Sequence, residues 1–167
     1  MADPSLIEYD AFLVAGINVP LTPGYDTRDL WQQLYEQLGS EKCRSLEKMQ
    51  RVGVIMPDAE DQGLTYTAGY MVRSIAEVSA LGLTGVIVPR SMYATVLING
   101  AEQNAIDEGF DVLASQFIPA KALSPTGVRL EVYGPADMDP SDYRMYVWSG
   151  VTGISATPED VFAENVV

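Results

Sequence analysis

The chain contains the same order of predicted elements twice: strand, helix, strand, strand. Each copy holds one amphipathic helix, which is too small to cover a sheet alone, so the two copies are expected to share a core. The sequence therefore predicts an α+β fold in which two pseudo-symmetric βαββ repeats form one continuous antiparallel sheet packed with helices. A cleft where two such halves meet is a natural site for a ligand.

The first copy is read from turn signals and from the spacing of apolar residues. Asp26 and Thr27 are suited to cap a helix, and Trp31, Leu34 and Leu38 then follow the spacing of one buried helix face. In the stretch 64–72, Tyr66 and Tyr70 share one face of a strand, because side chains alternate along it. The expected elements are a strand at 12–20, a helix at 27–39, and strands at 51–57 and 64–72.

The second copy follows the stretch from Ser74 to Gly85. A strand region is expected at 86–98, in which Pro89 and Ser91 mark a bulge or a break in pairing. Apolar residues from Ile106 to Phe117 then form a helical stripe that Pro119 ends. Two further strands are expected, one around Glu131 and one at 143–148. These elements define a domain over 1–150, and the tail at 151–167 contains Thr157-Pro-Glu-Asp, a good start for one short helix.

Composition excludes several kinds of chemistry. At 167 residues the chain suits one domain, or two small fused modules, and is expected to bury roughly 68–70% of its unfolded surface. It has no histidine and one cysteine, Cys43, which removes Ser-His-Asp and Cys-His catalysis, histidine-ligated metals and internal disulfides. Neither a metal nor another cofactor is expected.

The balance of charge and the apolar segments indicate partners and location. The net charge of −13 disfavours direct DNA binding and favours cationic partners or simple solubility. The start of the chain lacks the basic and apolar regions of a signal peptide, and no apolar run approaches the about 20 residues of a membrane span. We therefore expect a soluble, cytoplasmic protein without membrane contact.

Glu131 interrupts an apolar strand in the segment Gly127–Gly134. A carboxylate in a strand core is costly unless it is paired, protonated or able to meet a cation. Glu131 is therefore the first candidate for a binding or catalytic group, at the bottom of an aromatic cavity. The alternative is an edge-strand glutamate that faces water.

Several local patterns occur in the same order as in the GyrI-like effector-binding domain, and together they resemble it. This domain is the ligand module of multidrug-sensing transcription regulators, and the resemblance here is to its free-standing form. They span about residues 10–150. The matching segments are Phe12–Gly16, Leu30-Trp31, Tyr66–Gly69, Val88–Val96, Leu130–Tyr133 and Tyr146–Trp148.

The resemblance implies a curved antiparallel sheet with a central pocket for lipophilic, often cationic, compounds, and it places the pocket glutamate of the family at Glu131. A carboxylate and aromatic ring faces hold a delocalised cation, each cation–π contact being worth about 0.5–2 kcal/mol. Any one of the aromatic residues can instead pack across the sheet or in the core. The pocket walls are expected to come from Trp31, Tyr66, Tyr70, Tyr93, Tyr146 and Trp148.

Three functions stay open at this point. The first is a stand-alone protein that binds lipophilic, preferably cationic, small molecules. The second is a hydrolase of the same fold in which Glu131 acts as general acid or base, with Tyr133 or Tyr93 assisting. The third is a protein-binding inhibitor, such as a gyrase modulator, that uses acidic patches at 58–61, 102–108 and 137–142.

Overall fold

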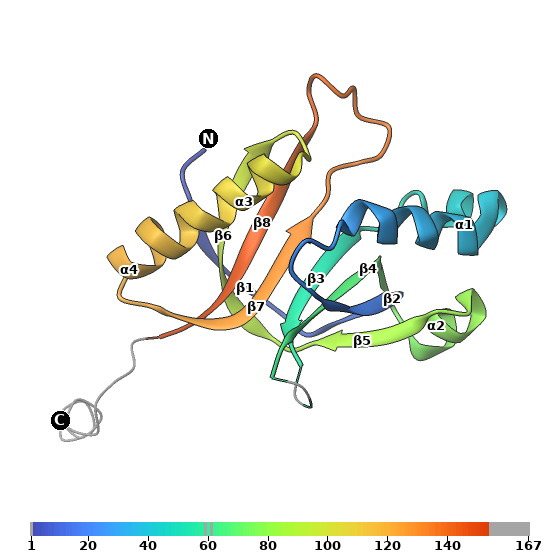
Figure 1. Cartoon of the computed structure of the whole chain (residues 1–167), viewed down its shortest axis with the longest axis horizontal. Helices are drawn as coiled ribbons and strands as arrows, with labels where there is room; N and C mark the ends of the chain where they lie inside the picture. Colours follow the sequence, from blue (N-terminus) through green and yellow to red (C-terminus); the bar gives the residue numbers. More distant parts are fainter. Residues whose placement is uncertain (1, 59, 61, 154–167) are drawn as a thin grey trace.

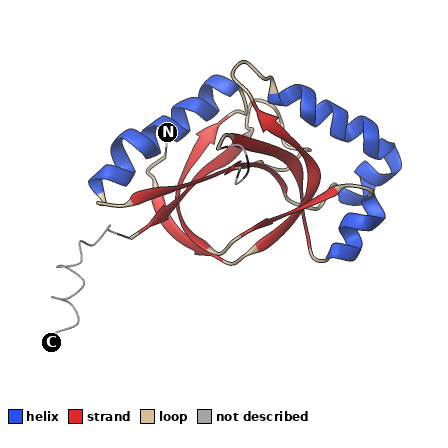
Figure 2. Ribbon diagram, turned by 60° about the horizontal axis from the view of Figure 1, so that its bottom comes forward, coloured by secondary structure: helices blue, strands red, loops and turns tan. Residues whose placement is uncertain are grey.

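The computed structural model describes residues 2–58, 60 and 62–153 of the chain. The strands form one eight-stranded sheet in the order β1-β6-β8-β7-β3-β4-β2-β5, and every neighbouring pair is antiparallel. The sheet is curved, and the helices lie outside the curve (Figure 2). The predicted α+β class and the continuous antiparallel sheet are therefore confirmed.

The two βαββ repeats are visible in the order of the strands. From the outside inwards, one half contains β2, β4 and β3 and the other contains β6, β8 and β7, so that β3 and β7 meet at the centre. The bounds are β2 Phe12–Leu21, β3 Arg51–Pro57, β4 Leu64–Val72, β6 Ser91–Asn99, β7 Ser124–Val132 and β8 Arg144–Thr152.

The two outermost strands cross between the repeats. β1 (Ser5–Tyr9) precedes the first repeat but pairs with β6 of the second, and β5 (Thr84–Val88) precedes the second repeat but pairs with β2 of the first. Each repeat is thus completed by a strand that lies next to the other repeat in sequence. This exchange ties the halves together at both edges, in addition to the central β3–β7 pairing.

The helices of the described residues all cover one face of the sheet, which we call the helical face (Figures 1 and 2). α1 (Thr27–Leu46) packs on β4 and β2, and α2 (Ile75–Leu81) packs on β2 and β5. α3 (Gln103–Val112) packs on β6 and β8 and continues through the π-helical turn η1 (Leu113–Phe117) into α4 (Ile118–Ala120). None of the helices in the described part of the chain combines the length and apolar composition needed to cross a membrane.

The opposite face, which we call the inner face, has its own core. Valines of the central strands pack there with Leu130, Tyr93 and Trp148. Because side chains alternate along a strand, residues next to Leu130 and Trp148 in sequence point to the helical face instead. The two faces therefore bury different halves of the same strands.

Most predicted elements are confirmed, with four differences. β1 and α2 were not predicted, and the strand region at 86–98 is two strands separated at Pro89–Arg90, so the break in pairing is confirmed. The helix predicted at 27–39 continues to Leu46, with non-helical backbone at Gly39, whose φ is 76°. β8 extends to Thr152, beyond the predicted end at 148.

The α2 helix had a signal in the sequence. Ser74 accepts a hydrogen bond from the Glu77 N–H at the start of the helix, the Glu77 carboxylate accepts one from the Arg73 N–H, and Gly82 ends the helix with a φ of 68°. Such a capping residue with a glutamate three positions later, followed by a C-terminal glycine, is a recognised helix pattern. The helix predicted to start at Thr157 lies outside the described residues, and the domain boundary at 150 stays a prediction.

Gly53, at the centre of the sheet, leaves room for the Glu131 carboxyl group and the Tyr66 hydroxyl. Gly53 pairs with both Glu131 and Ala68, and a Cβ atom at Gly53 would overlap Glu131 Oε1 and lie 2.5 Å from the Tyr66 hydroxyl. We predict that Gly53→Ala lowers the free energy of unfolding by about 1–3 kcal/mol, the usual cost of overpacking. Chemical denaturation measures the loss.

Gly63→Ala is the matched control, because a Cβ atom at Gly63 has no neighbour within 4 Å. This variant is expected to stay within about 0.5 kcal/mol of the wild type. Equal stability of both variants would show that the space above Gly53 is not tightly filled.

Candidate functional site

Glu131 lies in the middle of the sheet. It pairs with Gly53 of β3 on one side and Val147 of β8 on the other, and only 2% of its surface is exposed. The alternative of an edge-strand glutamate that faces water is therefore wrong. Its side chain points to the helical face, between the positions of α1 and α3.

Two tyrosine hydroxyls donate hydrogen bonds to one oxygen of this carboxyl group. The Tyr66 hydroxyl lies 2.6 Å and the Tyr133 hydroxyl 2.8 Å from Glu131 Oε1. Trp31 Nε1 in turn donates to the Tyr66 hydroxyl at 2.9 Å, which makes Tyr66 a bridge between α1 and the carboxylate. Within the described residues, Glu131 Oε2 has no hydrogen-bond partner.

Burial controls the ionisation of this cluster. It raises the pKa of Glu131 above the usual carboxyl range, although the hydrogen bonds from Tyr66 and Tyr133 stabilise the charged form and offset part of the effect. Burial and the neighbouring Glu131 charge raise the pKa of Tyr66 and of Tyr133 well above that of free tyrosine. Both tyrosines therefore remain hydrogen-bond donors at neutral pH.

A cavity of about 410 Å³ opens beside Glu131. It lies between the start of α1 and α3. Tyr66 and Glu131 line it together with the charged groups Asp26, Arg28, Asp107 and Arg129 and the apolar residues Leu21, Ile55, Ile106 and Phe110.

A second cavity, of about 560 Å³, lies on the other side of Tyr133. Trp31 and Tyr35 of α1 line it, with Arg51 at the start of β3 and Tyr133 and Tyr143 from the segments next to β7 and β8. Arg28 lines both cavities. Glu131 and Tyr66 line the first cavity and Tyr133 lines the second, so the two lie on either side of the hydrogen-bonded cluster. We refer to the two neighbouring cavities together as the candidate groove.

The structure brings together only part of the predicted site. Trp31 and Tyr66 join Glu131 through hydrogen bonds, and Tyr133, predicted as an assisting group, does the same. Tyr70 is buried on the same face, where burial and the nearby Tyr35 raise its pKa to about 12.

The other three predicted aromatic residues point to the opposite side of the sheet. Tyr93 and Trp148 belong to the core of the inner face, with ring centroids 5.3 Å apart, and Tyr146 is 44% exposed. By strand register they lie on the face away from Glu131. The Tyr93 hydroxyl and Trp148 Nε1 are buried without a hydrogen-bond partner among the described residues, and burial raises the pKa of Tyr93 to about 12.

Sequence reasoning missed the charged groups of the groove. Arg129 shares its face with Glu131 because the two alternate along β7, and Tyr133 continues this alternation directly after the strand ends. Arg51 occupies the corresponding face of β3, two residues before Gly53. The twofold alternation on either side of Glu131 therefore held enough information to find Arg129, as it did for Tyr133. Arg51 requires the β3–β7 pairing, which no local pattern reveals.

Comparison with known proteins identifies the family. The profile of the Cass2 family, described as an integron-associated effector-binding protein, matches residues 5–148. The chain belongs to this family. The match confirms the resemblance to GyrI-like effector-binding domains, and small-molecule binding is the function that the family description supports. No curated protein matches this Cass2-family chain in sequence.

Solved structures agree with this fold. SAV2435 bound to tetraphenylphosphonium has a TM-score of 0.71 at 15% identity, with 95% of this chain and 99% of that chain covered. The C-terminal domain of EcmrR has a TM-score of 0.64 at 12% identity, with 91% and 98% covered. A Vibrio cholerae integron cassette protein has a TM-score of 0.63 at 14% identity, with 89% and 95% covered.

The raised pKa of Glu131 predicts how stability depends on pH. A carboxyl group whose pKa is higher in the folded than in the unfolded state stabilises the fold below the unfolded value, and this contribution is lost as pH rises through the folded value. Glutamine keeps the acceptor oxygen without the charge. We therefore expect the difference in melting temperature between Glu131→Gln and the wild type to shift in favour of the variant as the pH rises from 5 to 8. Calorimetry at each pH measures this difference.

Glu108→Gln removes an exposed carboxylate of α3 and controls for the change in net charge. A Glu131→Gln difference that stays constant over the same pH range would contradict the assignment of a raised pKa.

Proposed function

We propose that this Cass2-family protein binds lipophilic cations, either as effectors or to sequester them, with Glu131 as the counter-ion. One observation carries the proposal. Glu131 is nearly fully buried, it lines a cavity of about 410 Å³, and its hydrogen bonds within the described residues use only Oε1. A cation that reaches Oε2 would compensate the charge that burial disfavours.

The surroundings of the cavity suit a ligand with apolar parts. Ile55, Ile106 and Phe110 supply apolar area, and the rings of Tyr66 and, across the cluster, Trp31 supply aromatic surface. Ionic attraction in such a partly desolvated site is stronger than in water. That the structural neighbour SAV2435 is described with bound tetraphenylphosphonium supports a cationic ligand for this chain.

The alternatives from the sequence stay predictions. A hydrolase would use the same Glu131, with Tyr133 as its hydrogen-bonded neighbour. A protein-binding inhibitor would depend on the acidic surface patches instead. With a net charge of −13, we do not propose direct DNA binding.

Isothermal titration calorimetry with two matched compounds tests the proposal. Methyltriphenylphosphonium carries a delocalised positive charge, and triphenylphosphine oxide carries the same three phenyl groups without a net charge. We expect Glu131→Gln to weaken binding of the cation about tenfold, equivalent to about 1.4 kcal/mol. Binding of the oxide should change less than about twofold, because the apolar contacts are preserved.

Glu108→Gln serves again as the control for net charge and should leave both affinities unchanged. An equal loss of affinity for the two compounds in Glu131→Gln would mean that the carboxyl group acts only in structure.

A further inference from the structure

Arg51 is a half-buried cation held by neutral groups. Its Nη1 donates to the Tyr35 hydroxyl at 3.1 Å, and its Nη2 donates to the Gly134 carbonyl at 3.0 Å and to the Tyr143 hydroxyl at 3.3 Å. These bonds use three of the five N–H donors of a guanidinium group. Among residues 2–58, 60 and 62–153, no carboxylate lies close enough to form an ion pair with Arg51.

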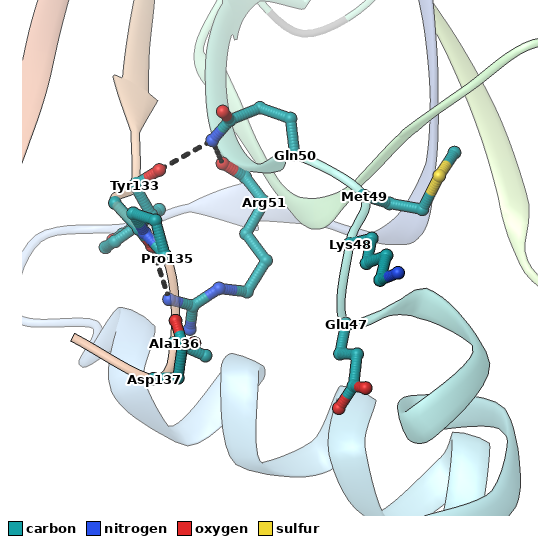
Figure 3. Close-up of a pocket in the computed structure, with 10 residues that line it drawn as sticks. Glu47, Lys48, Met49, Gln50, Arg51, Tyr133, Pro135, Ala136 and Asp137 are labelled. Atoms are coloured by element: carbon teal, nitrogen blue, oxygen red, sulfur yellow. Dashed lines mark hydrogen bonds between the residues drawn. The ribbon is translucent and has the colours of Figure 1, made fainter.

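Arg51 lies where two cavities meet. One is the aromatic cavity of about 560 Å³ described above, and the other, of about 620 Å³, lies between the segment Glu47–Gln50 and the chain after β7. Figure 3 shows the Arg51 side chain between these two segments, with its guanidinium group beside Pro135 and Ala136. Lys48, Glu47 and Asp137 also line this cavity of about 620 Å³.

Tyr133 links Arg51 to Glu131. The Arg51 guanidinium carbon lies 5.6 Å from the centroid of the Tyr133 ring, and the hydroxyl of that ring donates to Glu131 at 2.8 Å. Trp31 packs against the same ring edge to face, with centroids 5.2 Å apart. A positive group therefore lies over the ring of Tyr133, and a negative group accepts a hydrogen bond from the hydroxyl of the same residue.

This arrangement favours a ligand that carries both charges. A guanidinium group is always ionised at neutral pH and binds carboxylates through two parallel hydrogen bonds. Neutral hydroxyl and carbonyl acceptors satisfy its geometry but leave its charge uncompensated. An anionic group in the cavity in front of Arg51 would supply that compensation, while the aromatic rings of Trp31, Tyr35 and Tyr143 pack against the body of the ligand.

We propose that the groove has a second, anion-binding subsite at Arg51 and that the preferred ligands are amphoteric aromatic molecules, with a cationic part at Glu131 and a carboxylate at Arg51. The proposal rests on the proposed function, since it adds a second charge to the same ligand.

A purely structural role for Arg51 makes a different prediction. Its bonds to Gly134 and Tyr143 also fasten the connection between β7 and β8, and Gln50 does the same through the Tyr133 carbonyl (Figure 3). If fastening this connection is the whole role, substitution lowers stability and reduces all ligand affinities alike. Only an anion subsite distinguishes ligands by their negative charge.

Fluorescence polarisation with rhodamine B and its ethyl ester separates these roles. The two dyes share one delocalised cation, and only rhodamine B has a free carboxylate at pH 7.5. We expect the wild type to bind rhodamine B about tenfold more tightly than the ester. Arg51→Gln should abolish this preference with little change for the ester, Arg51→Lys should keep part of it, and the exposed Arg73→Gln should keep all of it.

The outcomes separate the two proposals. Equal wild-type affinity for both dyes, or a preference that survives in Arg51→Gln, overturns the anion subsite, even if Glu131→Gln weakens both dyes as the proposed function requires. Failure of both dyes to bind the wild type overturns the proposed function and the subsite together. If Arg51→Gln does not fold, the comparison of the dyes on the wild type and on Arg51→Lys decides.

Discussion

Glu131 places an ionisable carboxyl group in the middle of an eight-stranded sheet, and the surrounding structure compensates for that cost. Tyr66 and Tyr133 donate hydrogen bonds to one oxygen, and Trp31 orients Tyr66 from α1. Gly53 leaves the space that these groups occupy. Because the hydrogen bonds to Glu131 within the described residues use only Oε1, Oε2 remains available to a ligand that brings positive charge.

The repeat symmetry explains where this group lies. The strands β3 and β7 occupy equivalent positions in the two halves and meet at the centre of the sheet, so residues on their helical face lie between α1 and α3. Neither helix covers that position fully. The uncovered space forms the two cavities, one lined by Glu131 and the other by Tyr133. The fold thus creates a groove at its pseudo-symmetric centre, and the sequence places Glu131, Arg51 and Arg129 there.

Much of the fold could be predicted from local patterns, and less of the site. β3 and β4 match their predicted ranges because hydrophobic runs bounded by turn residues are local signals. The aromatic residues were harder, because Tyr93 and Trp148 satisfy the same strand patterns as Tyr66 but face the other side of the sheet. Their face depends on the pairing of β6 with β8 and of β7 with β3, which is set by contacts distant in sequence. Glu131 itself was predictable because a charge in an apolar strand requires a partner.

The most direct test is a carbon-13 NMR titration of the Glu131 side-chain carboxyl, assigned by its disappearance in Glu131→Gln, with and without saturating methyltriphenylphosphonium. A cation beside Oε2 stabilises the ionised form, so we expect the pKa of Glu131 to lie above the usual carboxyl range in the free protein and to fall when the cation binds. A pKa that does not respond to a bound cation would contradict the claim that Glu131 is its counter-ion.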